Sequence, residues 1–402
     1  MKIVKIYPIK SLMSHKKLIA KESERLIEQI KEKLNGYRFE YITDIKEAKS
    51  DDFIIILVQS GGSEDHFKNV VFASYDGPYY LLTYGSSNSL AASLEILSFI
   101  RQNNAKGEVL HGNIDYIVNR ITTLYGQNKD ANVSRLGVLG KPSDWLISSD
   151  VSYEKCKKVF NIELVDINQD VVVRYINDAV IDKKYLDGQF RYDENELSKA
   201  LKIYQGIKDI INDYKLDGIT IRCFDILGIF KSSSCLGLAI LNKDDVIASC
   251  EGDIPSMISA KIVYDLLHLH AFQANPQWIE PTKNEIYFAH CTLPLDMAND
   301  IVLDTHFESK IGVGIHGVMN KGDVTIFKIS NDLNMFYVEE GKLTKNEYRK
   351  DRCRTQIKIK LKGDVSYFLK SSLGNHHMII YGKHKDEIAS YLESFGLRRV
   401  TM

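Results

Sequence analysis

A short apolar run that ends in a cluster of acids constrains the fold of this chain most strongly. The run at 245–250 is mostly apolar and predicts a buried strand. The residues that follow it are Glu251, Gly252 and Asp253. Two residues later comes Pro255, and proline is well tolerated in the first turn of a helix. A strand that passes into a helix through a polar turn indicates an α/β unit that presents its acids at the edge of the sheet.

The first 130 residues alternate between strand and helix patterns. The strand patterns lie at 2–6, 37–42, 51–58 and 79–83, and the helical periodicities lie at 17–34 and 90–102. This alternation predicts a parallel α/β domain, in which ligands bind at the carboxyl ends of the strands. No glycine-rich phosphate-binding motif occurs in the sequence, which argues against a nucleotide site.

The rest of the chain predicts two further domains. Residues 131–215 contain a smaller α/β pattern that ends in a long amphipathic helix. From about residue 285 onward, strands with alternating or β-branched patterns are separated by Gly or Asn, which predicts an antiparallel barrel or sandwich. We therefore expect two N-terminal parallel-sheet α/β domains, 1–130 and 131–215, followed by a C-terminal α+β domain, 216–402, with an antiparallel β-barrel-like part.

The composition excludes several classes of partner. Lys and Arg number 52 and Asp and Glu 53, so the net charge of −1 does not support binding to nucleic acid or to an acidic membrane. The longest apolar runs have the length of strands, and the chain begins with a strand pattern rather than a signal peptide. Its 6 cysteines are scattered without a CxxC pair, which predicts reduced thiols in a cytoplasmic protein.

Acids and histidines punctuate the predicted strands of the C-terminal region. The set comprises Glu251, Asp253, His290, His306, Glu308, His376 and His377. Oxygen and nitrogen donors of this kind suit Mn²⁺, Fe²⁺, Co²⁺ or Zn²⁺, and the lack of clustered thiolates argues against a structural zinc site. A single histidine is more often structural than a ligand, so the residues alone predict an α/β enzyme and leave its metal dependence open.

Six ordered strings stand out, at 140–147, 248–256, 289–294, 305–315, 353–356 and 374–377. They resemble strings of the L-fucose isomerase and L-arabinose isomerase superfamily, and in particular of its shorter "L-fucose isomerase-like" proteins. The resemblance is strongest from residue 216 onward and weakest in the first 130 residues. It implies an enzyme that interconverts aldoses and ketoses with a bound divalent metal, usually Mn²⁺.

The resemblance also implies a set of metal ligands. Glu251, His290 and His376 match the family's acidic and histidine ligands, with His377 as the alternative to His376. Asn275 occupies the position of the second acidic ligand, which is a departure from the family pattern. An amide oxygen can bind a metal but cannot accept a proton as a base.

The same resemblance makes Glu251, Asp253 and Asn275 the candidate catalytic residues. Because asparagine is not a base, either Asp253, Glu280 or Glu308 replaces it, or the position aligned with the family's acid lies elsewhere. The candidate contacts to the sugar are Asn88, Trp145, Arg222, His306, Glu308 and His377. Histidine ligands must be neutral, so we expect activity to fall as the pH drops toward the ordinary histidine pKa of about 6.5. A homo-oligomer, trimeric or hexameric, is implied, with the N-terminal domain of one subunit covering the metal of another.

The substrate and the class of protein stay open at this point. The substrate is a monosaccharide, either a neutral aldose or sulfoquinovose, a 6-sulfonated glucose that some fucose-isomerase-like proteins are thought to convert to 6-deoxy-6-sulfofructose. A sulfonate needs a cationic contact, for which the candidates are Lys141, Arg222, Lys310 and Arg354. A non-catalytic sugar-binding protein is the alternative class, favoured by Asn275 and opposed by the presence of Glu251, His290 and His376.

Overall fold

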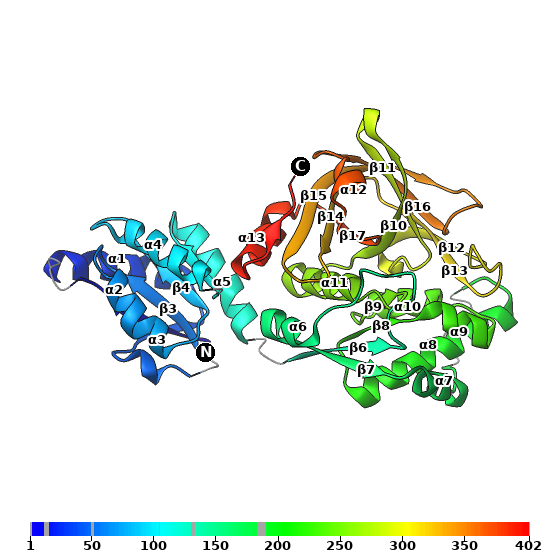
Figure 1. Ribbon diagram of the computed structural model, residues 1–402, viewed down its shortest axis with the longest axis horizontal. Helices are drawn as coiled ribbons and strands as arrows, with labels where there is room; N and C mark the ends of the chain where they lie inside the picture. Colours follow the sequence, from blue (N-terminus) through cyan, green and yellow to red (C-terminus); the bar gives the residue numbers. More distant parts are fainter. Residues whose placement is uncertain are drawn as a thin grey trace. The chain divides into compact units, whose positions relative to one another are not determined.

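The computed structural model (Figure 1) describes residues 2–11, 16–49, 52–103, 105–129, 133–182 and 190–401. The chain divides into two compact units, which we describe separately. Unit 1 comprises residues 1–132 and 394–396, and unit 2 comprises residues 133–393 and 397–402. The division into three domains near residues 130 and 215 stays a prediction.

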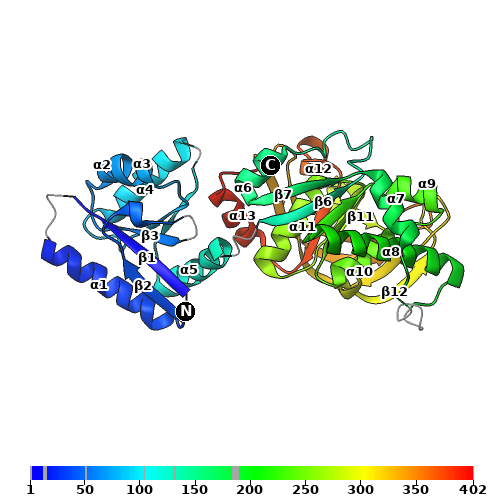
Figure 2. The same ribbon diagram turned by 90° about the horizontal axis from the view of Figure 1, so that it is seen from below.

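Unit 1 is a parallel α/β sandwich. Its five-stranded sheet has the order β2-β1-β3-β4-β5, with strands β1 (Lys2–Ile9), β2 (Tyr37–Tyr41), β3 (Phe53–Val58), β4 (Tyr79–Leu82) and β5 (Gly107–Leu110). Helices α1 (Lys16–Lys33) and α5 (Ile114–Lys129) cover one face, and α2 (Glu64–His66), α3 (Phe72–Ser74) and α4 (Ser89–Gln102) cover the other (Figure 2). All six residues of β3 are apolar and buried, because helices cover a parallel sheet on both sides.

Unit 2 begins with a second parallel sheet, of order β7-β6-β8-β9. Its strands are β6 (Ser134–Leu139), β7 (Ile162–Ile167), β8 (Gly218–Ile221) and β9 (Ile247–Cys250). Its helices are α6 (Tyr153–Phe160), α7 (Gln169–Asp178), α8 (Glu194–Tyr214), α9 (Cys223–Phe230), α10 (Cys235–Lys243) and α11 (Ile254–Leu267). None of the helices in the described part of the chain is both long and apolar enough to cross a membrane.

Two apolar stretches of this region form helix. Strand β8 ends at Ile221, and α9 begins at Cys223. The apolar segment at 235–241, compatible with either a strand or a helix, is helix α10. Residues 235–242 of this helix are all buried, so the sequence there lacks the polar face that marks an ordinary surface helix.

The second part of unit 2 is a closed antiparallel barrel. Its strands follow the order β14-β17-β10-β11-β16-β15, and pairing of β14 with β15 closes the ring (Figure 1). They are β10 (Phe272–Glu280), β11 (Glu285–His290), β14 (Gly322–Ile329), β15 (Met335–Glu347), β16 (Thr355–Leu361) and β17 (His377–Tyr381). Strands β12 (Ala298–Asp304) and β13 (Gly314–Met319) pair separately, β18 (Arg398–Arg399) runs parallel to β15, and α12 (Tyr367–Lys370) and α13 (Lys385–Ser394) complete the chain. The predicted fold class is confirmed.

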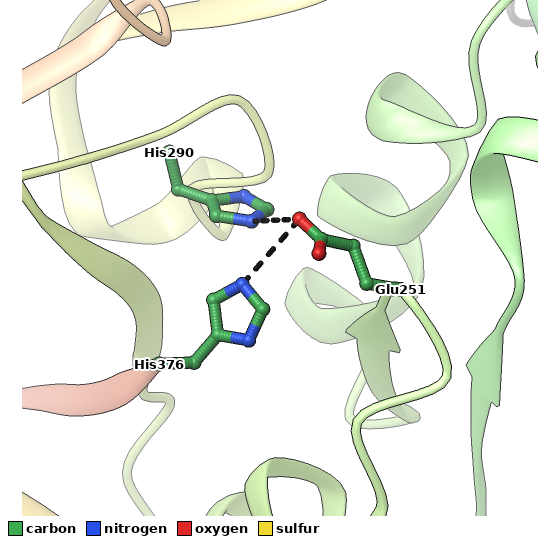
Figure 3. Close-up of side chains that lie close together, drawn as sticks. All are labelled: Glu251, His290 and His376. Carbon is green, nitrogen blue, oxygen red and sulfur yellow. Dashed lines mark ion pairs between the residues drawn. The ribbon is translucent and has the colours of Figure 1, made fainter. Parts of the chain in front are cut away.

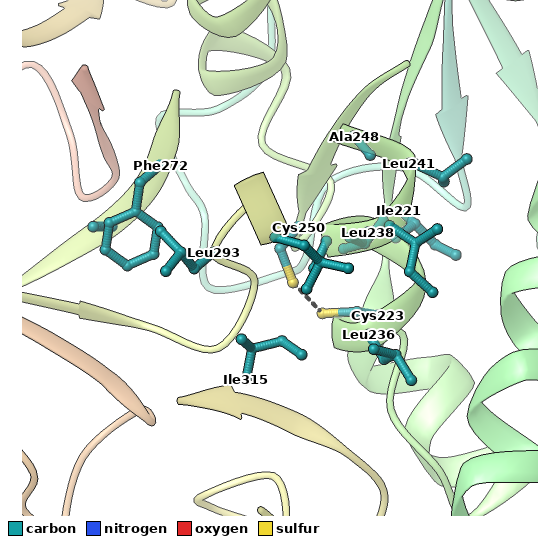
Figure 4. Close-up of a cluster of buried hydrophobic side chains, with 14 of the residues drawn as sticks. Ile221, Cys223, Leu236, Leu238, Leu241, Ala248, Cys250, Phe272, Leu293 and Ile315 are labelled. Atoms are coloured by element: carbon teal, nitrogen blue, oxygen red, sulfur yellow. Dashed lines mark hydrogen bonds between the residues drawn. The ribbon is translucent and has the colours of Figure 1, made fainter. Parts of the chain in front are cut away.

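One hydrophobic core joins the parallel sheet of unit 2 to its barrel. Figure 4 shows Ile221 and Cys250 from the sheet in the same buried cluster as Phe272, Leu293 and Ile315 from the barrel region. In addition, the Gln273 side chain in β10 accepts a hydrogen bond of 2.8 Å from the backbone N–H of Cys250. The carboxyl end of β9 is therefore held against the barrel.

Candidate metal centre

Three side chains from separate strands converge at this junction. Glu251 follows β9, His290 is the last residue of β11, and His376 directly precedes β17 (Figure 3). One ligand atom from each lies within 4.8 Å of the others. Glu251 Oε1 is 3.5 Å from His376 Nε2 and 3.9 Å from His290 Nε2. His376 Nε2 is buried and makes no hydrogen bond within the described structure. A carboxylate and two imidazoles in this arrangement could hold a divalent metal ion.

The backbone after β9 aims the Glu251 carboxylate at the histidines. Glu251 has a φ of +63°, in the left-handed region that costs energy for a residue with a Cβ. Gly252 follows with a φ of +70°, and a Cβ there would lie 2.4 Å from the carbonyl oxygen of Lys141. Only glycine fits at this position, which explains the Glu-Gly-Asp string.

A second layer of buried groups orients the two histidines. His376 Nδ1 lies 2.8 Å from Asp253 Oδ2, and because a carboxylate only accepts, this nitrogen donates and Nε2 is left facing Glu251. Asp253 also accepts a hydrogen bond of 2.9 Å from the backbone N–H of Ser256, at the start of α11. Its Oδ2 is 3.6 Å from Lys328 Nζ, and both side chains are almost fully buried. His290 Nδ1 lies within hydrogen-bond distance of Thr292 Oγ1, at 2.8 Å.

The surroundings of Glu251, His290 and His376 shift their pKa values in different directions from the ordinary ones. Burial raises the pKa of Glu251, but the imidazoles of His376 and His290 outweigh burial and lower it to about 2. Burial lowers the pKa of His290 to about 4. Burial also lowers the pKa of His376, but Glu251 and Asp253 outweigh it and raise this pKa to about 9. At neutral pH, the metal-free protein therefore holds an ionised Glu251, a neutral His290 and a protonated His376.

Binding of Mn²⁺ at pH 7.5 is expected to release about one proton per site, because His376 must lose its proton to become a ligand. The apparent affinity for Mn²⁺ should rise about tenfold per pH unit between pH 7 and 9. This pH range lies above the one that an ordinary histidine pKa would give. The same raised pKa stabilises the metal-free fold fully below about pH 6.5, and this contribution is lost as the pH rises through about 9. Calorimetric titration in buffers of different ionisation enthalpy measures the proton release, and a pH-independent affinity would contradict this assignment.

A pocket of about 230 Å³ opens beside the candidate metal centre. Glu251 and His290 line it, together with Asn275 from β10. The Asn275 side-chain oxygen is buried and accepts no hydrogen bond from the described residues, so it is free to accept one from a ligand or to bind a cation. The remaining lining residues are Cys223, Phe224, Leu227, Ser233, Ser234, Cys235, Cys250, Gln277, Cys291, His306, Phe307, Glu308 and Cys353.

Other residues predicted for the site also lie at this centre. Trp145 Nε1 donates a hydrogen bond of 2.9 Å to Glu251 Oε2, so this half-exposed indole holds the carboxylate. His306 and Glu308, which the sequence names as candidate sugar contacts, line the pocket. The Asp253 carboxylate instead lies behind His376 and does not line the pocket, so it is positioned to orient the histidine rather than to reach a substrate.

Two histidines that are adjacent in sequence have different environments. Unlike His376, His377 lies in an aromatic cluster of the barrel, where Nε2 is 3.1 Å from the Tyr367 hydroxyl and Nδ1 is 3.0 Å from the carbonyl oxygen of Asn375. Burial lowers the pKa of His377 to about 3. The structure therefore brings His376, and not His377, to the candidate metal centre.

Two further predicted sugar contacts are not brought to the pocket of unit 2. Arg222 is bound to Asp144 by two hydrogen bonds of 2.7 and 3.0 Å and to Asp225 by one of 2.9 Å. Asn88 belongs to unit 1, where it lines a separate pocket with Gly61 and Gly62.

Sequence reasoning missed several residues of the site. Thr292 carries no recognisable signal. Lys328 lies near the end of the mostly apolar run 324–329, which could have marked it as a buried partner for an acid. Five of the six cysteines line the pocket, namely Cys223, Cys235, Cys250, Cys291 and Cys353. All six are free, and the Sγ atoms of Cys223 and Cys250 are 3.0 Å apart (Figure 4).

The fold and the site together define an α/β protein with a candidate metal centre between a parallel sheet and a barrel. No protein-family model matches the chain. It is similar to the sulfoquinovose isomerases of Priestia aryabhattai and Priestia megaterium, with 23% identity over 273 residues, which cover 63% of this chain and 61% of each relative. It is also similar to the sulfoquinovose isomerase of a Clostridium species, with 23% identity over 211 residues, or 49% of this chain and 46% of that relative. The chain thus spans about three fifths of the length of the Priestia proteins, and these distant similarities support a relationship to sugar isomerases.

Proposed function

We propose that this protein is a metal-dependent isomerase that interconverts an aldose and a ketose. The observation that carries the proposal is the convergence of Glu251, His290 and His376 beside a pocket, with His376 Nε2 left without a hydrogen bond in the described structure. A non-catalytic sugar-binding protein would have no need for such a donor set. Moving the carbonyl between C1 and C2 requires one proton to pass between these carbons and a second proton to pass between the oxygens that they carry.

The donor set fits Mn²⁺ or another divalent ion of similar preference. Glu251, His290 and His376 would hold it, with the amide oxygen of Asn275 as a fourth ligand. When bound, the ion supplies a Lewis acid that stabilises the negative charge developing on the sugar oxygens. Asp253 and Thr292 would keep the two imidazoles in the orientation that binding requires.

Glu308 is the residue that we assign as the base. Glu251 has a pKa of about 2, which suits a ligand but makes a weak base, and Asp253 has a pKa well below its ordinary value and lies behind His376. Glu280, another candidate from the sequence, accepts a hydrogen bond from Thr282 and does not line the pocket. Glu308 does line the pocket, so it would carry the proton between C1 and C2.

We propose sulfoquinovose as the substrate, because the three relatives are named sulfoquinovose isomerases. We further propose a homo-oligomer of three or six subunits, in which unit 1 with Asn88 covers the metal centre of a neighbouring copy. The six free cysteines are typical of a reducing compartment, which favours the cytoplasm for this reaction.

Ketose formation from sulfoquinovose in the presence of Mn²⁺ is the expected result of a first assay. Glucose and L-fucose serve as neutral comparisons, and a sample treated with a chelator serves as the metal-free control. If the protein converts a neutral aldose but not sulfoquinovose, the isomerase function is supported and the proposed substrate is wrong. If the metal-loaded protein converts none of these sugars, the proposed function is wrong.

A further inference from the structure

The N-terminal end of helix α10 lines the same pocket as the candidate metal centre. Ser233, Ser234 and Cys235 at this end are lining residues, together with Glu251. The first backbone N–H groups of a helix have no partner within the helix and carry a partial positive charge. Ser234 is the N-cap residue, yet its side chain makes no capping hydrogen bond. This helix end is therefore available to accept an anionic group.

Ser234 provides a second and independent sign of a ligand. Its side chain is fully buried, and within the described structure its hydroxyl makes no hydrogen bond. Folded proteins pair nearly all of their buried polar groups, so an exception that lines a pocket indicates a group that the ligand satisfies. Asn275 is the other pocket residue with a buried polar atom left in this state.

The loop that carries Ser234 is held rigidly by its neighbours. The hydroxyl of Ser233 donates a hydrogen bond of 2.6 Å to the carbonyl oxygen of Val313 and accepts one of 3.0 Å from its N–H. The backbone of Gly312 approaches so closely that a Cβ there would lie 2.5 Å from the Ser233 nitrogen. The Ser233 hydroxyl is thus occupied by hydrogen bonds within the fold, whereas the Ser234 hydroxyl makes none within the described structure.

The charges around the pocket determine which anion fits. Neither lysine nor arginine occurs among the described residues that line it, and two acids, Glu251 and Glu308, do. Arg222 and Arg354, predicted as sulfonate contacts, are already bound to Asp144 and to Thr305. A dianionic phosphate would lack a counter-charge there, whereas a monoanionic sulfonate offers three acceptor oxygens to N–H and O–H donors.

We infer that Ser234 and the first-turn N–H groups of α10 bind the sulfonate of the substrate. This inference rests on the proposed function, because it places the charged end of a sulfonated sugar in the pocket that holds the metal ligands. The subsite recognises a sulfonate through a helix terminus and a hydroxyl instead of through an arginine.

Replacing Ser234 with alanine is expected to raise KM for sulfoquinovose about tenfold. The ratio of kcat/KM for sulfoquinovose to that for glucose should fall by the same factor. Ser234→Thr keeps the hydroxyl and is expected to retain most of the preference. The metal content of both variants, measured by elemental analysis, should match that of the wild type, because Ser234 is not a ligand.

Thermal melting separates this role from a structural one. Without ligand, Ser234→Ala should melt at the same temperature as the wild type or slightly higher, because it removes a buried hydroxyl that has no partner. Methanesulfonate should inhibit the wild type competitively and inhibit Ser234→Ala about tenfold more weakly. An unchanged KM together with a lower melting temperature in Ser234→Ala would overturn the inference. If the wild type converts only neutral sugars, the sulfonate subsite is wrong but the isomerase function is supported. If the wild type converts no sugar, the proposed function itself is wrong.

Discussion

Glu251→Gln is expected to lose tightly bound metal and to lower isomerase turnover by at least about a thousandfold. The substitution keeps the size of the side chain and its contact with Trp145, but it replaces an ionised ligand with a neutral amide. The loss of a metal ion's Lewis acidity removes several kcal/mol of transition-state stabilisation, which corresponds to a factor of this size. Elemental analysis of the purified variant and a ketose assay at saturating Mn²⁺ measure the two effects.

Glu308→Gln is the matched control for this substitution. Both residues line the pocket, but Glu308 is outside the set of converging ligands. Its replacement should leave the metal content unchanged and lower kcat by a factor of about 10² to 10⁴, the usual contribution of a general base. If Glu251→Gln keeps both metal and turnover, the assignment of the metal centre is wrong. If Glu308→Gln retains full kcat, the base is a different residue.

Asp253→Asn is expected to destabilise the protein by about 3–5 kcal/mol, the usual cost of removing one partner from a buried ion pair. Asp253 is 1% exposed and Lys328 2%, so the lysine would be left without a counter-charge away from water. Burial already lowers the pKa of Lys328. Asparagine can still cap the N-terminus of α11, so the loss of stability measures the removal of the charge rather than the loss of the cap. Urea unfolding followed by circular dichroism measures the change.

The double variant Asp253→Asn, Lys328→Met tests whether the cost comes from the unpaired charge. Removing both charges should recover most of the lost stability, because the buried lysine no longer needs a partner. The metal affinity should remain about 10- to 100-fold weaker in the double variant, since His376 has lost the carboxylate that orients it. Glu347→Gln, which breaks the surface ion pair with Lys345, is the control and should change the stability far less than Asp253→Asn. Equal losses in the buried and surface variants would contradict this account.

Local patterns in the sequence determined much of the architecture. The alternation of strands and helices in the first 130 residues predicted the parallel sheet of unit 1, and the strand-rich region after residue 285 predicted the barrel. These patterns are readable because side-chain burial repeats every two residues in strands and every 3.6 in helices. The pattern was ambiguous where burial was complete, as in α10, which has no polar face.

The candidate metal ligands could be named from the sequence, whereas the residues that support them could not. Glu251, His290 and His376 were named because the short strings that contain them resemble those of a known family. The choice between His376 and His377 was not local. Tertiary packing places His377 among the aromatic residues of the barrel and His376 against Asp253, which lies 123 positions earlier in the chain.

The functions of the remaining groups depended on the tertiary structure alone. The sequence names Trp145 as a candidate sugar contact, and the fold adds that its N–H donates a hydrogen bond to Glu251. Arg222 could be read as an anion contact, but two nearby aspartates already bind it. Ser234 has no sequence signal, and its buried hydroxyl without a described partner is recognisable only once α10 is packed against the pocket. Sequence periodicity encodes which face of an element is buried, but hydrogen bonds and ion pairs between distant segments form only when the whole core closes around them.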